Sequence, residues 1–288
     1  MAGSRFFCAL LGFSIAALVQ AVAPVSAAET PLERGTYLMR GIVACGNCHT
    51  PKGPDGIALP DRELAGGLVI DTPVFRAVVP NITPDNETGI GKWTGDQLVA
   101  AIREGKRPDG SIIGPPMPIE MYRAMSDSDA RAIVAYLRAI EPIRNATEKS
   151  TYRIPLPASY GPPVGHVADV PPANKLAYGK YLSDIGHCMD CHSPLVRGQL
   201  DLTRAGMGGR ELGAFPSGVT VTANLTSANP DGIAKWTDAQ VKQSLVTGIR
   251  PDGRHLVRLM AFDWYKTIAS KDLDALVAYL RTLKPARQ

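Results

Sequence analysis

Two short stretches of the chain combine cysteine and histidine in a spacing that supports cofactor chemistry. They are Cys45-Gly46-Asn47-Cys48-His49 and Cys188-Met189-Asp190-Cys191-His192, and both have the form Cys-x-x-Cys-His. In this arrangement the two thiols add across the two vinyl groups of a haem, and the adjacent histidine binds the iron. The motifs therefore predict two covalently bound haems. Their attachment residues are Cys45, Cys48, Cys188 and Cys191, and their proximal iron ligands are His49 and His192.

Redox-active thiol pairs and zinc sites also use Cys-x-x-Cys, but neither requires the histidine. A thioredoxin-like pair is expected in a βαβ setting, for which the sequence gives no signal. A four-cysteine zinc site needs both pairs in one place. Here the pairs start 143 residues apart, at Cys45 and Cys188, so haem attachment is the favoured interpretation.

The two motifs belong to a repeat that covers most of the chain. At the same offset of 143 residues, Asn81-Ile82-Thr83 matches Asn224-Leu225-Thr226, Lys92-Trp93-Thr94 matches Lys235-Trp236-Thr237, and Arg107-Pro108-Asp109-Gly110 matches Arg250-Pro251-Asp252-Gly253. We therefore predict two tandem domains, at residues 28–140 and 174–288. Residues 141–173 are rich in proline, and we expect them to form a semi-rigid linker that joins the domains without merging their cores.

Helical periodicity recurs three times in each predicted domain. The stretches are residues 31–44, 95–105 and 126–140 in the first domain, and 174–186, 238–248 and 270–283 in the second. Ser126 and Ser270 are expected to cap helix N-termini, and Gly105 and Gly248 to end helices. The regions between show no sustained alternation of apolar and polar residues. The predicted fold class is therefore all-α, with long ordered loops.

The repeat also selects the second axial ligand of each iron. Among eight methionines, Met117 falls on Met260, whereas Met121 and Met125 have no methionine counterpart. Met117 stands between prolines, which hold a loop rigid, and the second copy lacks those prolines. We predict Met117 and Met260 as distal ligands, since methionine opposite histidine is typical of electron-transfer haems. His187 and His255 remain alternative ligands for the second iron, and His166 lies in the predicted linker.

Other repeated residues have two interpretations each. Trp93 and Trp236 are suited either to bind a haem propionate or to pack a helix start. Arg107 and Arg250 precede Pro-Asp-Gly turns and are suited either to pair with propionates or to serve the turns alone. The Asn-x-Thr triplets match a glycosylation pattern. Their recurrence at one position of the repeat favours a structural loop near the haem instead.

The first 27 residues have the composition of a cleaved signal peptide. Arg5 precedes an apolar run at residues 6–19, and Val25-Ser26-Ala27 offers a cleavage site. No later stretch is long and apolar enough to span a bilayer. The mature chain is therefore expected in the periplasm, either soluble or peripherally attached to a membrane. The 31 basic and 27 acidic residues are spread along the chain, so a nucleic-acid partner is not expected.

The sequence resembles the class I cytochrome c fold used twice. More narrowly, it is similar to the cytochrome c subunits of bacterial alcohol, aldehyde and gluconate dehydrogenases. The shared features are Gly35-Thr36-Tyr37-Leu38, Cys48-His49-Thr50-Pro51, Asn81-Ile82-Thr83-Pro84-Asp85, Gly89-Ile90-Gly91-Lys92-Trp93-Thr94, and the closing helix from Ser128 to Leu137. The resemblance covers both halves. Those subunits commonly carry three haem motifs, and this chain has two.

The resemblance implies an electron carrier rather than an enzyme. Its expected partners are a dehydrogenase subunit as electron donor and a cytochrome or oxidase as acceptor. The alternative is a dihaem enzyme of the peroxidase or thiosulfate-oxidising type, which needs an open or unusually ligated iron. Cys8 lies in the predicted leader. No spare cysteine therefore remains to ligate an iron, and the matched methionines favour the carrier.

Overall fold

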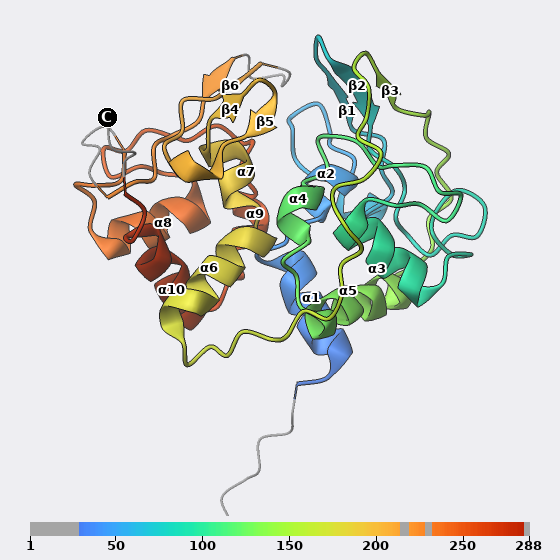
Figure 1. The fold of residues 1–288 in the computed structure, drawn as a ribbon, viewed down its shortest axis with the longest axis horizontal. Coiled ribbons are helices and arrows are strands. Elements are labelled where there is room, and N and C mark those ends of the chain that lie inside the picture. Colours follow the sequence, from blue (N-terminus) through green and yellow to red (C-terminus); the bar gives the residue numbers. More distant parts are fainter. Residues whose placement is uncertain (1–28, 214–218, 228–231, 285–288) are drawn as a thin grey trace, which may run out of the picture.

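The computed structural model of the chain describes residues 29–213, 219–227 and 232–284, so the predicted signal peptide lies outside the described residues. Two groups of helices stand side by side (Figure 1). The first half contains α1 (Pro31–Arg40), α2 (Gly46–His49), α3 (Gly95–Glu104), α4 (Ile119–Tyr122) and α5 (Asp127–Ala139). The second half contains α6 (Lys175–Ile185), α7 (Cys188–His192), α8 (Asp238–Thr247), α9 (Phe262–Tyr265) and α10 (Ser270–Leu280). The six longer helices confirm the predicted periodic stretches, with ends that differ by a few residues.

Helix ends follow the local sequence closely. Gly105 and Gly248 end α3 and α8 in the left-handed conformation, as predicted. Ser126 caps α5, because its side chain accepts a hydrogen bond from the Asp129 amide. The expected cap at Ser270 is wrong: α10 already begins at Ser270, and Ala269 occupies the extended position before it. A methyl side chain cannot accept a hydrogen bond, so α10 starts without a side-chain cap.

The first and last helices of each half cross at a glycine. A Cβ atom added to Gly35 of α1 would lie 2.0 Å from the Ala132 carbonyl oxygen of α5. A Cβ atom added to Gly179 of α6 would lie 1.9 Å from the Ala275 carbonyl oxygen of α10. Only glycine allows the backbones to approach this closely. The repeat in the sequence is therefore a repeat of helix packing as well (Figure 1).

Small sheets accompany the helices, so the fold is mostly helical rather than all-α. β1 (Val69–Asp71), β2 (Phe75–Val78) and β3 (Thr151–Tyr152) form an antiparallel sheet in that order. β4 (Leu195–Val196) pairs with β5 (Gln199–Leu200), and β6 (Glu211–Leu212) pairs with β7 (Thr220–Val221). Two short 3-10 helices, η1 (Pro60–Arg62) and η2 (Leu202–Arg204), complete the elements. Strands of two to four residues are too short to produce an alternating pattern in the sequence.

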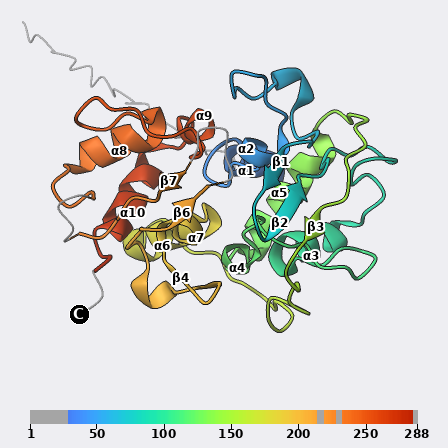
Figure 2. The same ribbon diagram turned by 90° about the horizontal axis from the view of Figure 1, so that it is seen from above.

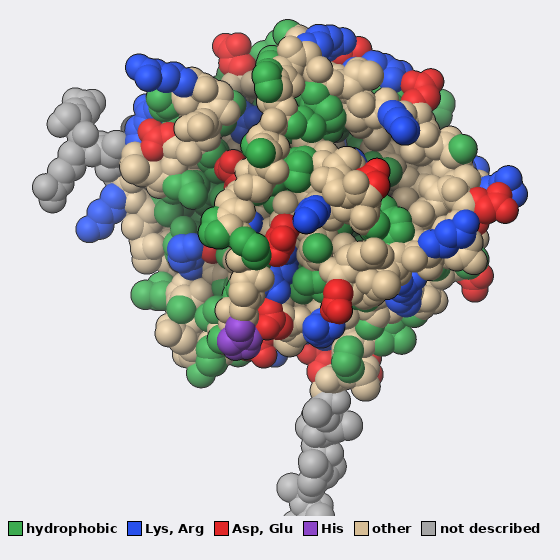
Figure 3. Space-filling view, turned by 45° about the vertical axis from the view of Figure 1, so that its right-hand side comes forward, with side chains coloured by type: hydrophobic (Ala, Val, Ile, Leu, Met, Phe, Trp, Pro, Cys, Tyr) green, Lys and Arg blue, Asp and Glu red, His purple; other side chains and the backbone are tan. Residues whose placement is uncertain are grey.

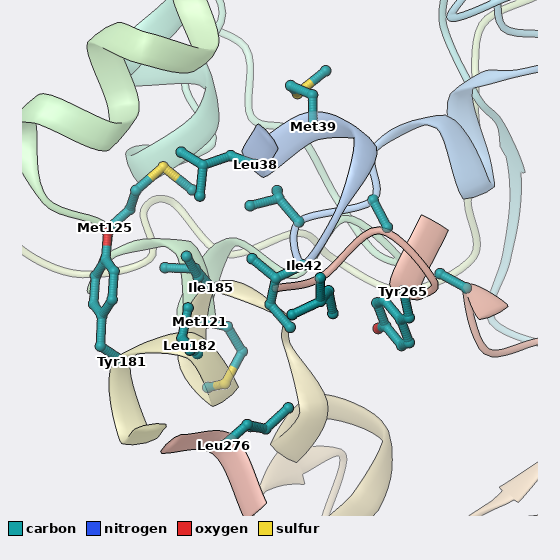
Figure 4. Close-up of a cluster of buried hydrophobic side chains, with 14 of the residues drawn as sticks. Leu38, Met39, Ile42, Met121, Met125, Tyr181, Leu182, Ile185, Tyr265 and Leu276 are labelled. Carbon is teal, nitrogen blue, oxygen red and sulfur yellow. The ribbon is translucent and has the colours of Figure 1, made fainter. Parts of the chain in front are cut away.

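The two halves share one hydrophobic core, contrary to the expectation of separate cores. Ile42 of the first half reaches the end of α6, where a Cβ atom on Gly186 would lie 2.9 Å from its Cδ1 atom. Figure 4 shows Leu38 and Ile42 in one cluster with Leu182 and Leu276 of the second half. Burial of apolar area across the boundary stabilises a fixed arrangement of the halves.

Reciprocal hydrogen bonds between tyrosine and aspartate join the halves. The Tyr37 hydroxyl donates to Asp272 at 2.6 Å, and the Tyr181 hydroxyl donates to Asp129 at 2.6 Å. Asp129 also accepts two bonds from Arg34, at 2.7 and 2.9 Å. Burial raises the pKa of both tyrosines well above the usual range, so both remain O–H donors near neutral pH.

The predicted linker does not hang free but lies along the first half. β3 extends the β1–β2 sheet, and the Tyr160 hydroxyl donates to the Ile113 carbonyl oxygen at 2.9 Å. Arg123 donates to the Pro162 carbonyl oxygen at 2.7 Å. Further on, the His166 Nδ1 atom lies 2.6 Å from the Asp127 carboxylate. We call residues 141–169 the strap, because backbone and side-chain bonds fasten this segment to the first half.

The attachment of the strap predicts a pH dependence of stability. Hydrogen bonds from His166, which has the larger effect, and from Arg103 lower the pKa of Asp127 from 3.8 to about 2. A carboxyl group whose pKa is lowered by folding stabilises the folded state above its unfolded pKa, and this contribution is lost as the pH falls through the folded value. The difference in unfolding free energy between the wild type and Asp127→Asn should therefore shrink between pH 3.8 and about 2. Urea unfolding across this range measures it, and a constant difference would contradict the prediction.

On the face drawn in Figure 3, basic and acidic side chains are intermixed, and neither kind forms a large patch of its own. Within residues 29–213, 219–227 and 232–284, no helix has the length and apolar character needed to cross a membrane.

Candidate haem sites

Both Cys-x-x-Cys-His motifs form short helices that gather the predicted attachment residues. Cys45 immediately precedes α2 and Cys48 lies one turn later, so both thiols lie on one side of the turn. Cys188 and Cys191 have the same spacing within α7. All four are free thiols. Burial, as the main cause, raises the pKa of Cys45 to about 12 and that of Cys188 to about 11, so these thiols are neutral at physiological pH.

Each predicted proximal histidine is held by a backbone carbonyl. The His49 Nδ1 atom lies 2.9 Å from the Pro80 carbonyl oxygen, and the His192 Nδ1 atom lies 2.8 Å from the Ala223 carbonyl oxygen. A carbonyl can only accept, so Nδ1 carries the proton and Nε2 keeps its lone pair for a metal. Burial lowers the pKa of both histidines, which favours the neutral ring that a metal ligand requires.

The repeated Asn-x-Thr triplets build the turns that supply these carbonyls. The Asn81 side-chain oxygen accepts from the Thr83 amide at 2.9 Å and from the Thr83 hydroxyl at 2.8 Å. Asn224 makes the same two bonds to Thr226, at 2.8 and 2.7 Å. The residue before each asparagine carries the carbonyl that receives the histidine proton. The structure thus confirms the interpretation of the triplets as structural loops beside the predicted haem ligands.

Two glycines let the carbonyl loops approach the histidines. The Gly66 amide donates to the His49 carbonyl oxygen at 2.7 Å, and the Gly208 amide donates to the His192 carbonyl oxygen at 2.8 Å. Both glycines have positive φ, at 75° and 64°. A Cβ atom on Gly66 would lie 2.4 Å from the Pro80 carbonyl carbon, and one on Gly208 would lie 2.5 Å from the Ala223 oxygen. Each glycine therefore allows the carbonyl loop to lie within hydrogen-bond distance of the histidine that it orients.

Neighbouring glycines allow a matched test of this spacing. Gly208 and Gly209 both have positive φ, but a Cβ atom on Gly209 would have no atom within 4 Å. Gly209→Ala is expected to cost only about 1 kcal/mol for its backbone conformation. Gly208→Ala adds the clash with the carbonyl loop and should cost about 3 kcal/mol. Denaturant unfolding of the two variants measures the difference, and equal losses would show that the close approach is unimportant.

Met117 and Met260 occupy equivalent places in the two halves. Each lies in the bend just before a short helix, and their carbonyl oxygens accept from Ile119 and Phe262, both at 2.9 Å. Both side chains are half-buried. The unmatched methionines that are at most 6% exposed belong to the hydrophobic core; they are Met39, Met121, Met125 and Met189. The structure therefore separates the predicted ligand pair from these core methionines, and ligation itself stays a prediction.

The histidines outside the motifs have other environments. His187 packs edge-on against the Tyr122 ring, with ring centroids 6.0 Å apart, and burial lowers its pKa to about 4. His255 is exposed, as expected for a surface histidine. His166 binds Asp127 through the strap.

The repeated arginines differ between the halves. Arg107 donates to the Ile112 carbonyl oxygen at 2.8 Å, which supports the interpretation that it serves its own turn. The Arg250 guanidinium lies over the Trp236 ring, 5.2 Å from its centroid. The Arg250 Nε atom is buried without a hydrogen-bond partner, although Asp252 lies 3.5 Å away. A buried guanidinium N–H that makes no hydrogen bond fits an anionic group such as a propionate.

The first motif lies against α9 of the second half. Seen from above, α9 of the second half lies beside α2 of the first (Figure 2). A Cβ atom on Gly46 of α2 would lie 2.8 Å from the Trp264 indole nitrogen of α9.

The residues present fit two haem groups. Each half offers two free thiols, an imidazole whose Nε2 is left open, and a half-buried methionine at an equivalent position. Within the part of the chain that the structure describes, no group of three or more His, Cys, Asp and Glu side chains is arranged to hold a metal ion alone. The mostly helical halves and their duplicated motifs have the features of the c-type cytochromes.

Comparison with known proteins supports this class. The chain is 30% identical, over 96% of its length, to the fructose dehydrogenase cytochrome subunit of Gluconobacter japonicus, of which it covers 57%. It is 32% identical, over 79% of its length, to the gluconate 2-dehydrogenase cytochrome c subunit of Pantoea cypripedii, of which it covers 53%. A diheme cytochrome c-type protein of Cereibacter sphaeroides is 29% identical over 82% of this chain and 81% of its own length. No family model matches the chain.

These similarities confirm the predicted resemblance: the chain is a relative of cytochrome c subunits of bacterial dehydrogenases and of a diheme cytochrome c. It spans about half the length of the dehydrogenase cytochrome subunits. The names of these relatives are those of cytochrome subunits, which agrees with the prediction of an electron carrier rather than an enzyme.

Proposed function

We propose that the chain is a periplasmic dihaem cytochrome c that relays single electrons from a dehydrogenase to a downstream cytochrome or oxidase. It would consist of two tandem cytochrome c domains, at residues 28–140 and 174–288, after removal of residues 1–27. The observation that carries this proposal is the duplicated histidine geometry, with Nδ1 to carbonyl distances of 2.9 Å in the first half and 2.8 Å in the second. Two sites built alike favour two cofactors with the same task.

The chain's own residues have distinct parts in this proposal. A bound haem supplies one-electron chemistry at its iron. The cysteines of α2 and α7 would fix the cofactor covalently, and His49 and His192 would bind the iron through Nε2. Met117 and Met260 would each supply a second protein ligand to an iron, which would exclude substrates from the metal and raise its potential. The Arg250 Nε atom, which has no hydrogen-bond partner, is suited to hold a propionate of the second haem.

The partner classes follow from the relatives. Two of them are named as cytochrome subunits of fructose and gluconate dehydrogenases, which favours a dehydrogenase as the electron donor. The predicted signal peptide supports export. Export also agrees with the cofactor, because covalent haem attachment of this kind is expected outside the cytoplasm. The mixed charges on the face in Figure 3 suit the small docking surfaces of transient redox partners.

Optical and electron paramagnetic resonance spectra of the exported protein test the proposal. Two low-spin haems with methionine ligation in both oxidation states are expected, with no reaction with cyanide. A high-spin haem that binds cyanide would favour the alternative, a dihaem enzyme of the peroxidase or thiosulfate-oxidising type. Reduction of the protein by a purified periplasmic dehydrogenase would then identify the donor.

A further inference from the structure

Asn47 links the first haem motif to the loop that carries Met260. Asn47 lies between the two cysteines of the first motif, and its Nδ2 atom donates to the Leu259 carbonyl oxygen at 3.1 Å. Leu259 directly precedes Met260 in the second half. The Asn47 Oδ1 atom accepts from Lys52 at 3.3 Å, which orients the amide so that its donor side faces Leu259. One side chain of α2 therefore holds the backbone next to a predicted ligand of the other half.

The same helix also contacts the chain beyond Met260. Trp264 of α9 lies against Gly46, where a Cβ atom would be 2.8 Å from the indole nitrogen. Any larger residue at position 46 would require the indole to move. The Met260 carbonyl oxygen accepts from the Phe262 amide at 2.9 Å, at the start of α9. The segment from Leu259 to Trp264 thus rests on α2 on both sides of Met260.

The equivalent loop of the first half is stabilised in a different way. Met117 is surrounded by Pro115, Pro116 and Pro118, whereas Met260 is flanked by Leu259 and Ala261. Proline restricts the backbone and so keeps a loop in one conformation. The second loop lacks this restriction, so its conformation depends more on contacts from outside.

In the part of the chain that is described, the second motif makes no equivalent contact with the methionine loop of the first half. The repeat places Asp190 at the position of Asn47, and an ionised carboxylate has no N–H group to donate to a carbonyl. Among the described residues, the Asp190 side chain makes no hydrogen bond to the loop before Met117. The α2 contact therefore replaces, in the second half, the rigidity that prolines give to the first.

We propose that Asn47 is a positioning residue for Met260, so that the iron ligation of the second half depends on the first haem motif. This inference rests on the proposed function, in which Met260 is an iron ligand. The bond between a methionine sulfur and iron is weak enough that loop freedom lowers the fraction of ligated iron. Loss of the Asn47 bond should therefore affect the second haem, although the residue belongs to the first motif.

Asn47→Asp tests the proposal in the haem-loaded protein, because it keeps the side-chain shape and removes the donor. Hydrogen exchange of amides at residues 256–262 should become about fivefold faster, the factor expected for an ordinary hydrogen bond. The methionine methyl resonance assigned to Met260 with a Met260→Ala variant should shift or broaden, and that of Met117 should not. The potential of the second haem should fall. Unchanged exchange and an unchanged Met260 signal would overturn the proposal.

Three further variants separate positioning from general damage. Lys52→Ala keeps the Nδ2 donor but removes the bond that orients the amide, so it should accelerate exchange at residues 256–262 less than Asn47→Asp does. Asp190→Asn, at the equivalent position of the second motif, should leave exchange at residues 113–119 unchanged. Ala261→Pro should restore slow exchange in the Asn47→Asp background, because the φ of Ala261, −81°, is close to the −84° of Pro118. Failure of this rescue would argue against loop positioning as the cause.

The exchange measurement does not require Met260 to bind iron. If the spectra of Met260→Ala are the same as those of the wild type, the proposed ligand assignment fails. If Asn47→Asp leaves exchange in the loop unchanged, the positioning role fails. The two failures are therefore distinguishable.

Discussion

Gly35→Ala and Gly179→Ala are each expected to lower the free energy of unfolding by about 3 kcal/mol or more. A new methyl group would lie 2.0 Å from the Ala132 carbonyl oxygen in the first case and 1.9 Å from the Ala275 carbonyl oxygen in the second. The obstructing atoms belong to helix backbones, so no side-chain rotation relieves the contact. The crossing helices must move apart, and the core between them loses packing. Urea unfolding of the haem-loaded protein measures the loss.

Gly95→Ala provides the matched control for both substitutions. Gly95 also lies in a helix, α3, but its added Cβ atom would meet only the Val134 Cγ1 atom at 3.8 Å. This is ordinary contact, and alanine has the higher helix propensity, so a neutral effect or a gain of up to about 1 kcal/mol is expected. If all three variants behaved alike, the close crossing of α1 with α5 and of α6 with α10 would not be the reason for glycine.

Met117→Ala and Met260→Ala are each expected to convert half of the haem from a low-spin to a high-spin form that binds cyanide. Each substitution removes one predicted axial ligand and leaves the histidine of the same half in place. The potential of the affected haem should fall, because methionine ligation raises it. Cyanide titration followed by optical spectroscopy gives the affected fraction, about one half for each variant and all of the haem for the double variant.

Met121→Leu distinguishes loss of a ligand from loss of packing. Met121 is only 6% exposed and belongs to the hydrophobic core, so leucine should cost less than about 1.5 kcal/mol and leave both haems low-spin. A cyanide-binding haem in this variant, or none in Met260→Ala, would contradict the ligand assignment.

The sequence predicts the features that depend on neighbouring residues. Helical periodicity gives the long helices, and the residue at each end decides whether it is capped, as Ser126 and Gly105 illustrate. The error at Ser270 has the same local origin, because a serine one position inside the helix cannot act as the cap. The Cys-x-x-Cys-His motif requires only one helical turn, so its geometry also follows from a short stretch.

The features that depend on distant residues had weaker signals or none. The carbonyls that hold His49 and His192 lie 31 residues further along the chain, and a backbone acceptor has no residue-type signature. Their only signal was the recurrence of the triplets that begin at Asn81 and Asn224. A sequence repeat shows which positions of the two halves are equivalent. It gives no information on which residues of the two halves touch, such as Tyr37 and Asp272.

The strap illustrates the limit of composition as a guide. Proline content correctly indicates that residues 141–173 do not form a helix. It does not indicate where the segment docks, which is decided by scattered partners such as Arg123 and Asp127 in the first half. The expectation of separate cores failed for the same reason, because the apolar residues that join the halves lie on or next to helices that also pack within their own half.

Intact-mass measurement of the exported, denatured polypeptide tests the central claim most directly. Thioether bonds survive unfolding, so the account predicts a mass that exceeds the mature chain by two haem groups. Alanine at both cysteines of either motif should reduce this excess to one haem. A wild-type mass with no added haem, or with only one, would contradict the account.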